Sequence, residues 1–580
     1  MVSSYAENMV NDPIIVCISD DKNALDNFEN FLHDGFGENG KFIMNFPTIY
    51  IHNWRENLGY EVYVGESNNI FQRTRQHFDE SANENAWQHN ILSHKASLYI
   101  IGHEHFNKSL TLAIENQLIQ YMLGITSVKR VYNGRGNPQN MYYPDNEFEA
   151  IFNKIWENLG TKDPTLFPSI TTIKDSAVFK ASPLHKLTED QENAKALIIK
   201  KVKQALDNDE KRQLVFIDGE AGTGKTVLNS STFYDLCCDG RRCCLLVNHD
   251  EQITVYKQIS DKLGLTERYG EVVCKPTSFI NNQSVDDPID VAFIDEAHLL
   301  LTQGKQSYRG RNQLADVIDR ARITIVMFDE NQILTTEQYW ESELLETYRN
   351  RAKELNNHLS LTTQLRMQVD LDTLKWIDSF TKDRTLGRIP KNSKYLIRIF
   401  DTPKELDEAI TDLSKKKESK LSRLIATYDW EYSSKSPDVQ SGRYWEVQIE
   451  DWHKPWNREL EKELSREEKK RNKSLAWAEQ PQTIGEVGST FTIQGFDLNY
   501  AGVILGPSVK YRDGRIVFDP RESRNEKAVQ NRTLNDGRKQ SFGKTLIQHE
   551  VRVLMTRGVN GLFIYACDPE LRQALKDASL

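Results

Sequence analysis

The sequence predicts an α/β multidomain protein, in which a small α+β domain is followed by two lobes that are each built on a parallel sheet. Short apolar segments alternate with helical stretches from about residue 187 onward, a pattern typical of parallel sheets. A glycine-rich turn, GEAGTGKT, joins one of these segments to a helix. Two short β-type segments around Tyr50 and Tyr63 predict paired antiparallel strands upstream. A length of 580 residues accommodates about three or four domains.

We expect five consecutive parts: an N-terminal extension at residues 1–45, the small α+β domain at 46–145, a polar linker at 146–182, a first lobe at 183–345 and a second lobe at 346–580. The linker is expected because Pro164 and Pro168 interrupt a polar stretch. The second lobe is expected to carry two insertions, near residues 430–480 and 508–544.

The overall charge limits the partners that the chain can bind. A net charge of −10 at pH 7 excludes a uniformly basic surface, so binding of nucleic acid would need local basic patches. The sequence has neither an apolar run of about 18 residues nor a cationic start followed by an apolar segment. We therefore expect a cytoplasmic protein with no membrane partner.

The stretch LVFIDGEAGTGKT, from Leu214 to Thr226, predicts a site for a nucleoside triphosphate. An apolar strand runs into a full match to the phosphate-loop pattern, and a helix follows. Backbone N–H groups of such a loop face phosphate oxygens, Lys225 neutralises the β/γ-phosphates, and the Thr226 hydroxyl holds Mg²⁺. The loop glycines expected to contact the nucleotide are Gly219, Gly222 and Gly224.

Two further apolar strands end in polar residues with matching roles. The strand Val291–Ile294 is followed by Asp295, expected to hold Mg²⁺ through water, and by Glu296, expected to polarise the attacking water. The strand Ile323–Phe328 leads to Gln332, which is placed to sense the γ-phosphate.

Three more residues are candidates for nucleotide contacts. Gln191 precedes the phosphate-loop strand by one helix, and its two-faced amide is suited to read an adenine edge. Arg366, in LTTQLR, is placed to reach the phosphates from the second lobe. Arg557, in VRVLMTRG, is the best candidate for an arginine finger, the cation that completes phosphoryl transfer.

In the small domain, the residues resemble the GIY-YIG endonucleases over roughly residues 45–145. TIY at 48–50 and YVG at 63–65 fill the two name motifs. The other positions that match are Arg73, His77 one helical turn later, Glu115 inside a helical stretch, and Asn133 in a glycine-rich turn.

This resemblance implies metal-dependent phosphodiester hydrolysis. Tyr50 or Tyr63 would activate or orient water, with His77 assisting proton transfer. Arg73 would stabilise the developing charge, and Glu115 would ligate one divalent ion, Mg²⁺ or Mn²⁺. Two departures from the family pattern leave the general base open: Thr48 replaces the first glycine, and Glu66 stands where some members carry a lysine.

The larger part of the chain, roughly residues 183–575, resembles the superfamily 1 helicases. It is most similar to the group described by a domain of unknown function (DUF2075), which is related to the helicase region of long Schlafen proteins. The motifs FIDGEAGTGKT, FIDEAH, FDENQ, LTTQLRM, STFTIQGFDLNYAGVILG and VRVLMTRG occur in that group's order. The resemblance implies two RecA-like lobes that close on ATP and grip single-stranded nucleic acid.

The two insertions each allow two interpretations. Residues 430–480 hold five tryptophans among charged runs, which could stack bases, although we favour an insertion with its own small core and a solvated helix at Leu460–Lys473. Residues 508–544 hold ten Lys or Arg against five Asp or Glu, which predicts either a loop that grips phosphates or a disordered surface loop.

Taken together, the sequence favours an ATP-dependent nuclease and translocase that acts on nucleic acid, with DNA favoured over RNA. Such a fusion is expected in prokaryotic defence against phage, with repair or RNA processing as the alternative role. A second hypothesis is an ATP-gated sensor whose N-terminal domain binds nucleic acid but does not cut it, and Thr48 and Glu66 keep it open. Protein partners and oligomeric state are not predicted.

Overall fold

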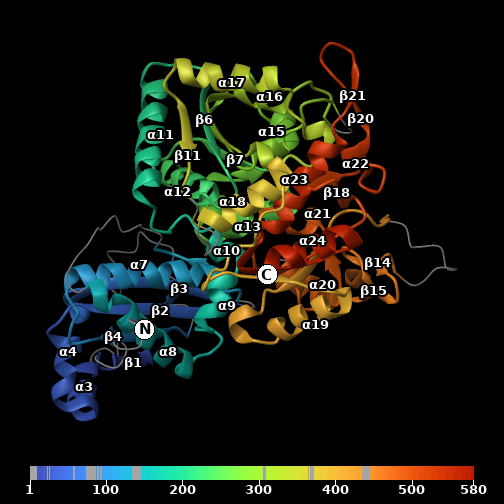
Figure 1. Ribbon diagram of the computed structural model, residues 1–580. Coiled ribbons are helices and arrows are strands. Elements are labelled where there is room, and N and C mark those ends of the chain that lie inside the picture. Colours follow the sequence, from blue (N-terminus) through green and yellow to red (C-terminus); the bar gives the residue numbers. More distant parts are fainter. Residues whose placement is uncertain are drawn as a thin grey trace. The chain divides into compact units, whose positions relative to one another are not determined.

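The computed structural model describes the chain except for residues 1–9, 22–23, 25–26, 57–58, 74–86, 88–89, 92–94, 134–144, 305–307, 364, 366–370, 434–443 and 474. The chain divides into two compact units (Figure 1). Unit 1 comprises Met1–Lys186 and Tyr256–Val272, and unit 2 comprises Leu187–Val255 and Val273–Leu580.

Unit 1 is built on a mixed sheet whose strands lie in the order β1-β4-β2-β3-β5. These strands are β1 (Ile14–Ser19), β2 (Thr48–Glu56), β3 (Gly59–Ser67), β4 (Ser97–Gly102) and β5 (Val128–Val131). All neighbours are antiparallel except β3 and β5. The two predicted strands therefore form the hairpin β2–β3, in which Tyr50 lies opposite Gly65 and His52 opposite Tyr63.

The expected N-terminal extension is not separate from this domain, because β1 pairs with β4 along its whole length. The helices α3 (Phe28–Phe36) and α4 (Lys41–Met44) follow β1. Phe28, Leu32 and Ile43 from this stretch belong to the same buried cluster as Tyr50. The boundary at residue 45 is thus wrong, since the residues before it complete one sheet and its core.

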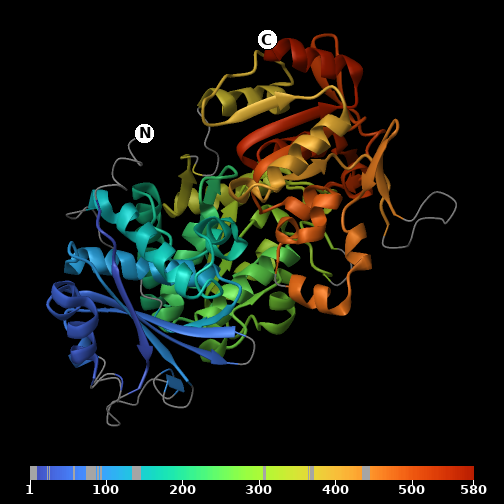
Figure 2. The same cartoon turned by 90° about the horizontal axis from the view of Figure 1, so that it is seen from below.

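The helix α7 (Lys108–Gly124) packs against β2, β3 and β5 (Figure 2). The expected polar linker is largely helical: it forms α8 (Phe148–Lys162), α9 (Ile170–Asp175) and α10 (Ala177–Lys180). Its apolar residues Ile151, Ile155, Trp156 and Leu159 recur at helical spacing and are buried, which explains why the segment folds onto the unit instead of linking two others.

A second chain segment completes unit 1. It contains the C-terminal half of α13 (Asp250–Lys262) and α14 (Leu265–Tyr269). Lys262 is buried, and its Nζ donates to the carbonyl oxygens of Leu123 at 2.7 Å and Ile125 at 2.8 Å, at the end of α7. Arg130 on β5 pairs with Glu267 at 2.8 Å. Two cations thus hold this segment in the unit.

In unit 2, lobe 1 (residues 187–255 and 273–361) has a parallel sheet in the order β11-β6-β10-β9-β7-β8. Its strands are β6 (Gln213–Gly219), β7 (Cys243–Leu246), β8 (Val273–Cys274), β9 (Ile289–Ile294), β10 (Ala321–Phe328) and β11 (His358–Leu361). Its helices are α11 (Glu189–Asp207), α12 (Lys225–Cys238), α15 (Pro276–Asn282), α16 (Gln313–Ile318) and α17 (Ser342–Glu354).

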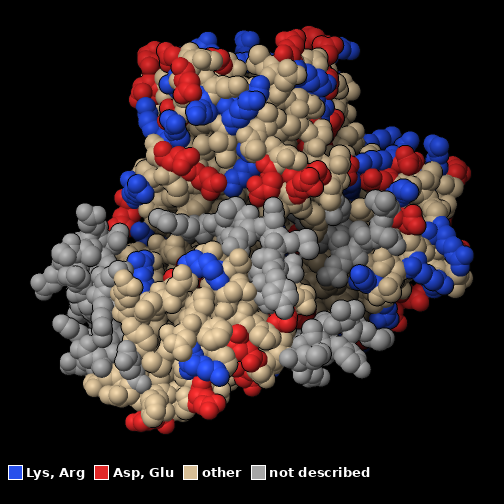
Figure 3. Space-filling model, turned by 90° about the vertical axis from the view of Figure 1, so that its left-hand side faces the viewer, with Lys and Arg blue, Asp and Glu red and all other residues tan. Residues whose placement is uncertain are grey.

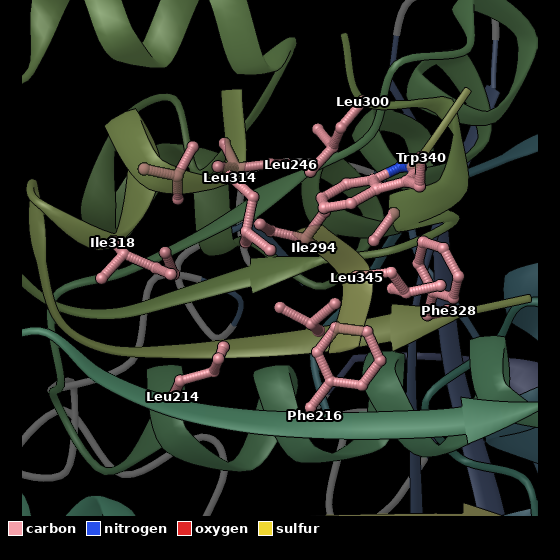
Figure 4. Packing of buried hydrophobic residues seen from close by; sticks show 14 of the residues in the cluster. Leu214, Phe216, Leu246, Ile294, Leu300, Leu314, Ile318, Phe328, Trp340 and Leu345 are labelled. Carbon is pink, nitrogen blue, oxygen red and sulfur yellow. The ribbon is translucent and has the colours of Figure 1, made fainter. Parts of the chain in front are cut away.

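The core of lobe 1 contains Leu214, Phe216, Ile294, Phe328 and Trp340, which lie between the sheet and the helices (Figure 4). The predicted boundary at residue 345 is too early, because β11 pairs with β6 in the same sheet. The phosphate-loop strand β6 and the carboxylate strand β9 are separated only by β10, so the carboxyl ends of all three strands meet at one edge.

Lobe 2 (residues 371–580) has a second parallel sheet, in the order β12-β22-β17-β13-β16. Its strands are β12 (Leu396–Ile399), β13 (Arg423–Ala426), β16 (Val487–Gly488), β17 (Leu498–Leu505) and β22 (Gly558–Ala566). Its main helices are α18 (Leu371–Asp378), α19 (Pro403–Ser414), α21 (Thr490–Ile493), α23 (Gly543–Met555) and α24 (Pro569–Ser579). The two parallel sheets confirm the expected pair of RecA-like lobes.

The first insertion does not form a core of its own. It contains the hairpin β14 (Glu446–Ile449) and β15 (Trp452–Pro455), followed by the short α20 (Arg466–Asn472) in place of the longer helix expected. Trp456 is fully buried in the core of lobe 2, beside Leu424 and Ile504. The tryptophans of this insertion therefore extend the core of the lobe.

The second insertion is ordered, so the interpretation as a disordered loop is wrong. It forms β18 (Val509–Arg512), β19 (Arg515–Phe518), α22 (Glu526–Val529), β20 (Asn531–Thr533) and β21 (Lys539–Ser541). Five of its basic side chains have acidic partners, namely Lys510, Arg512, Arg521, Arg532 and Arg538. Two of these partners, Asp568 and Glu341, lie outside the insertion, so part of the predicted charge excess is neutralised by the rest of the chain.

Arg532 in this insertion is 2% exposed and reaches lobe 1. Its Nη1 donates to Thr302 Oγ1 at 2.9 Å and to the Thr336 carbonyl at 2.7 Å. Beside it, Tyr339 of lobe 1 stacks on Phe542 of lobe 2 with ring centroids 3.8 Å apart. Residues 519–542 therefore form a strap from lobe 2 onto lobe 1.

Among the described residues, none of the helices is long and apolar enough to cross a membrane. On the face shown in Figure 3, positive and negative side chains are interspersed. This agrees with the absence of a uniformly basic surface that the net charge predicts.

Candidate active sites

The phosphate loop connects β6 to α12. Gly222 and Gly224 adopt φ values of +88° and +76°, which favour glycine. A Cβ on Gly224 would lie 2.1 Å from Nε2 of Gln191, so only glycine fits there. Lys225 Nζ donates to the carbonyl oxygens of Gly219 at 2.5 Å and Glu220 at 2.9 Å, and its ammonium is thus held at the loop.

Thr226 and Asp295 come together at the edge where β6 and β9 end. Thr226 Oγ1 donates to Asp295 Oδ2 at 3.2 Å. A hydroxyl and a carboxylate are the hard oxygen donors that Mg²⁺ prefers, so this pair fits the ion that the motif predicts. Bound there, Mg²⁺ would neutralise charge on the phosphate oxygens.

Glu296 lies beside this pair and is 6% exposed. Its φ of +48° is a left-handed conformation that non-glycine residues rarely adopt, and such strain concentrates at functional sites. Burial acts to raise the pKa of Glu296, but His298 and Lys225 outweigh burial and hold the pKa below its usual value. The carboxylate is therefore ionised and suited to accept a proton from water.

Gln332 links the lobes at the same edge. Its Nε2 donates to Asp329 Oδ2 at 2.8 Å, and its Oε1 accepts from Nη2 of Arg557 at 3.1 Å. Arg557 is fully buried and also donates to the Val553 carbonyl at 3.0 Å. The structure thus brings the predicted arginine finger to the predicted γ-phosphate sensor.

Arg552, on α23 and five positions before Arg557, was missed by the sequence reasoning. Its Nη2 donates to Glu220 Oε2 in the phosphate loop at 2.7 Å, and its Nε donates to Asp378 at 3.1 Å. It is 5% exposed, so lobe 2 places a second buried cation at the phosphate loop. The sequence signal was present, as an arginine five positions before Arg557 in VRVLMTRG.

The other two predicted nucleotide contacts differ in what the structure says of them. Gln191 Nε2 donates to the carbonyl oxygens of Thr223 at 3.4 Å and Gly224 at 3.3 Å, and its Oε1 accepts from the Thr188 amide at 2.9 Å. Its amide is therefore engaged by the phosphate loop and by the start of its own helix. Arg366 lies outside the described residues.

A cavity of about 850 Å³ opens beside this site. We call it the groove. The groove is lined by Asn248 and Lys275 of lobe 1 and by Phe491 of lobe 2. Residues of the first insertion between Arg458 and Gln480 also line it. Lys527 lies over the Phe491 ring, 5.4 Å from its centroid. An aromatic ring beside cations is the pattern that single-stranded nucleic acid binds.

Gln494 connects the groove to the ATP site. Its side chain lines the groove, and its Nε2 donates to the Gln332 carbonyl at 3.1 Å. The same nitrogen lies 3.4 Å from Nε2 of His298, which in turn lies 3.4 Å from Glu296. Occupation of the groove can thus reach the Glu296 carboxylate through the side chains of Gln494 and His298.

In unit 1, the predicted tyrosines and arginine form one cluster. Tyr50 and Tyr63 stack with ring centroids 6.1 Å apart, and Arg73 Nε donates to the Tyr50 hydroxyl at 3.4 Å. Burial, followed by the charge of Tyr63, raises the pKa of Tyr50 well above its usual range. Tyr50 therefore stays protonated and can orient a water molecule, but is a poor general base. His77 lies outside the described residues.

Glu115 of α7 and Asn133, which follows β5, form a second cluster beside β3. Asn133 Nδ2 donates to Glu115 Oε1 at 3.0 Å and to the Val64 carbonyl at 2.9 Å. Glu66, two residues further along β3, pairs with Lys108 at the start of α7. Lys108 thus places a lysine ammonium beside Glu66, the position where some GIY-YIG members carry a lysine. No pattern in the sequence predicts this pair.

Comparison with known proteins identifies unit 2. The family model described as the Schlafen group 3 DNA/RNA helicase domain matches residues 212–568. The chain belongs to this family. The matched range runs from the phosphate-loop strand β6 to just past the end of β22, and so includes both parallel sheets and both insertions.

One relative of the Schlafen-type chain is the uncharacterized protein YPL245W of Saccharomyces cerevisiae, which is 31% identical over 400 residues, or 62% of this chain and 83% of the yeast protein. The Pif1 helicase of Candida albicans is 15% identical over 40% of this chain, with a TM-score of 0.20. The match spans about half of the Pif1 chain, 55%.

The Sulfolobus solfataricus SWI2/SNF2 ATPase core, solved with dsDNA, is 11% identical over 66% of this chain and 88% of its own, with a TM-score of 0.24. Both superpositions are poor over the full chains. The Schlafen family model, and not these structures, identifies unit 2 as a helicase-type motor.

Proposed function

We propose that the protein is an ATP-dependent translocase on single-stranded nucleic acid that carries its own metal-dependent nuclease. The observation that supports the motor most strongly is the continuous set of contacts from Lys225 and Glu296 to Gln332 and Arg557, which joins groups from both lobes at one edge. ATP hydrolysis that changes these contacts would move one lobe against the other.

In this proposal, each residue has one task in ATP hydrolysis. Lys225 and the loop amides hold the phosphates, and Glu296 takes the proton of the attacking water. Arg557 stabilises the charge that develops on the γ-phosphate, with Gln332 positioning it. Gln494 would report on the groove, so that hydrolysis responds to bound nucleic acid.

We propose the nuclease for unit 1 because Tyr50, Tyr63 and Arg73 lie together. Asn133 contacts both Glu115 and β3, the strand that carries Tyr63. Glu115 would hold Mg²⁺ or Mn²⁺, which supplies a Lewis acid to the scissile phosphate. Arg73 would neutralise developing charge. A protonated Tyr50 would orient the attacking water but could not accept its proton. Another group would therefore have to act as the general base.

The test for both activities uses the whole chain. Lys225→Ala should abolish ATP hydrolysis, and Glu115→Ala should abolish nicking of a plasmid in Mg²⁺ or Mn²⁺ while ATP hydrolysis that is stimulated by single-stranded DNA stays near wild type. If Glu115→Ala nicks as well as wild type, the sensor that binds without cutting becomes the better function. Comparison of DNA with RNA of the same sequence in the stimulation assay would identify the strand that the motor prefers.

For the biological role, we propose defence against invading DNA, with repair or RNA processing as the alternative. The proposal rests on a motor and a nuclease in one chain, and one relative of the chain occurs in yeast. Phage plating on cells that express the wild-type chain or Glu115→Ala tests it, because defence by cutting requires the carboxylate.

A further inference from the structure

The groove is enclosed by a ring of contacts. Starting in lobe 1, Glu251 at the beginning of α13 pairs with Arg458 of the first insertion. Glu251 Oε2 also accepts from the backbone amide of Trp477 at 3.1 Å. Both partners line or adjoin the groove, so the insertion is tied to lobe 1 across the cavity.

From the insertion, the ring continues into lobe 2. Trp456 is fully buried in the core of lobe 2, and the Asn457 amide donates to the Val487 carbonyl at 2.8 Å. Trp477 Nε1 donates to Glu486 Oε1 at 2.7 Å, directly before α21, the helix that carries Phe491. These buried junctions fix the insertion to its lobe.

The ring closes where lobe 2 meets lobe 1. Gln494 donates to the Gln332 carbonyl, and Arg557 to the Gln332 side chain. Beyond this junction, the strap adds a second connection, because Gln530 Nε2 donates to Glu337 Oε1 at 2.7 Å and Glu337 lines the groove. Among the described residues, contacts therefore link lobe 1, the first insertion and lobe 2 in a closed circuit around the cavity.

The junctions differ in strength. Those to lobe 2 bury whole tryptophans, whereas the Glu251–Arg458 pair joins side chains that are 12% and 39% exposed. Partly exposed ion pairs contribute little to stability and are screened by salt. The Glu251 junction is thus the one that opens at least cost.

We infer that the motor encircles its strand: a single strand passes through the ring, and enters either by threading a free end or by opening of the Glu251–Arg458 junction. This inference rests on the proposed function, and it defines the bound substrate as a single strand that the ring encloses; a free end is required only when the junction cannot open. Lys469, Lys473 and Lys527 line the passage and face a phosphate backbone without base recognition.

The test compares a linear DNA oligonucleotide with the same sequence ligated into a covalently closed circle. The protein carries Glu251→Cys and Arg458→Cys, with the exposed Cys17 and Cys238 changed to serine. A short bismaleimide joins the two new cysteines and locks the ring. Each single-cysteine variant treated with the same reagent is the matched control.

In the locked protein, the linear strand should still stimulate ATP hydrolysis, while the circle should need at least about tenfold more DNA for half-maximal stimulation, if it stimulates at all. The single-cysteine controls should respond to both forms. When the reagent is added after the circle has bound, the circle should stay bound through a high-salt wash and the linear strand should be lost.

Equal stimulation of the locked protein by circle and linear strand would overturn the ring, and so would loss of both responses in the locked protein alone. Failure of the linear strand to stimulate the wild-type protein is a different result, because it would overturn the proposed motor function and not the ring. The wash adds a second readout that does not depend on ATP hydrolysis.

Discussion

The two candidate sites hold their reactive groups in opposite ways. In unit 2, Lys225, Glu296 and Arg557 are each at most 6% exposed and are engaged by protein partners. In unit 1, Arg73 is exposed and Glu115 is half-buried. The comparison teaches that the ATP site must rearrange to admit its small substrate, whereas the site in unit 1 is open to a large one such as a duplex.

The sites also differ in how far they reach along the chain. The unit 1 residues come from one hairpin and the elements that follow it, between Tyr50 and Asn133. The ATP site draws on both lobes, from Gln191 to Arg557. A change in one lobe is thus expected to disturb the ATP site without touching the site in unit 1.

The largest effect is expected for Arg557, which follows α23. Arg557→Lys should lower ATP hydrolysis by roughly 10³–10⁵, the range known for arginine fingers, with ATP affinity near wild type. Lysine keeps the charge but cannot bridge Gln332 and the phosphate at once. Arg552→Lys, on α23 itself, is the matched comparison. Steady-state hydrolysis and nucleotide titration check both, and a greater loss in Arg552→Lys would transfer the catalytic role to that residue.

Glu296→Gln should lower ATP hydrolysis by roughly 10²–10⁴, because the amide cannot accept a proton. ATP should still bind, since the shape of the side chain is kept. Glu330→Gln, exposed at the end of the neighbouring strand, is the control and should hydrolyse ATP normally. Single-turnover hydrolysis separates binding from chemistry, and a Glu296→Gln variant near the wild-type rate would refute the assignment.

The nuclease site should respond independently. Glu115→Gln should reduce plasmid nicking by at least about 100-fold, because loss of a metal ligand costs more than the 10–100-fold known for its outer partners. Stimulated ATP hydrolysis should not change, which sharpens the contrast between the sites. Glu157→Gln, exposed on α8, is the control in the same unit.

A smaller effect is expected where β3 meets Tyr50. A Cβ on Gly65 would lie 2.4 Å from the Tyr50 hydroxyl, so Gly65→Ala should displace the phenol and lower nicking by about 10–100-fold. Gly35→Ala adds a methyl where nothing lies within 4 Å and should nick like wild type. If both variants nick equally well, the position of Tyr50 does not matter for cutting.

The smallest effects concern stability, and the two units should respond to pH with opposite signs. In unit 2, burial, reinforced by Asp429, raises the pKa of Glu550 from 4.5 to about 8. The folded state thus keeps a proton that the unfolded state releases, and the stability of unit 2 should fall as pH rises from about 4.5 to 8.

In unit 1, burial, with a smaller effect of Lys129, lowers the pKa of Lys262 from 10.5 to about 7. Here the unfolded state binds more protons, so stability should rise with pH between about 7 and 10.5. Melting temperatures measured from pH 5 to 9 should show that Glu550→Gln reduces the first slope, to which Glu486 also contributes, and that Lys262→Met removes the second. A slope that survives its own substitution would assign it to other groups.

The ATP site could be predicted from the sequence because its parts are short strands with fixed endings. Strand β6 must be followed by Gly222 and Gly224 at left-handed φ, and Asp295 must follow β9, so the pattern carries the geometry. What the sequence missed are contacts between segments that lie far apart. Arg552 reaches Glu220 only because the lobes pack, and no local spacing encodes that distance.

The same reason explains the errors in domain boundaries. The linker at 146–182 looked polar by composition, yet Ile151, Trp156 and Leu159 bury a stripe against unit 1. The insertion at 508–544 looked like a basic loop, yet Arg532 is an internal anchor. The composition of a segment gives its numbers of polar and apolar side chains. Whether those side chains are buried depends on contacts with distant segments, which the composition of the segment does not describe.

The second segment of unit 1 has a consequence for how the protein is made. Residues 256–272 complete this unit, since Lys262 caps the end of α7 and Glu267 pairs with Arg130. On the ribosome, the phosphate loop at 219–226 emerges before these residues do. The unit that carries the candidate nuclease therefore cannot finish folding until the first part of the motor has been synthesised, and a fragment that ends at residue 186 would leave the carbonyl oxygens at the end of α7 without their lysine.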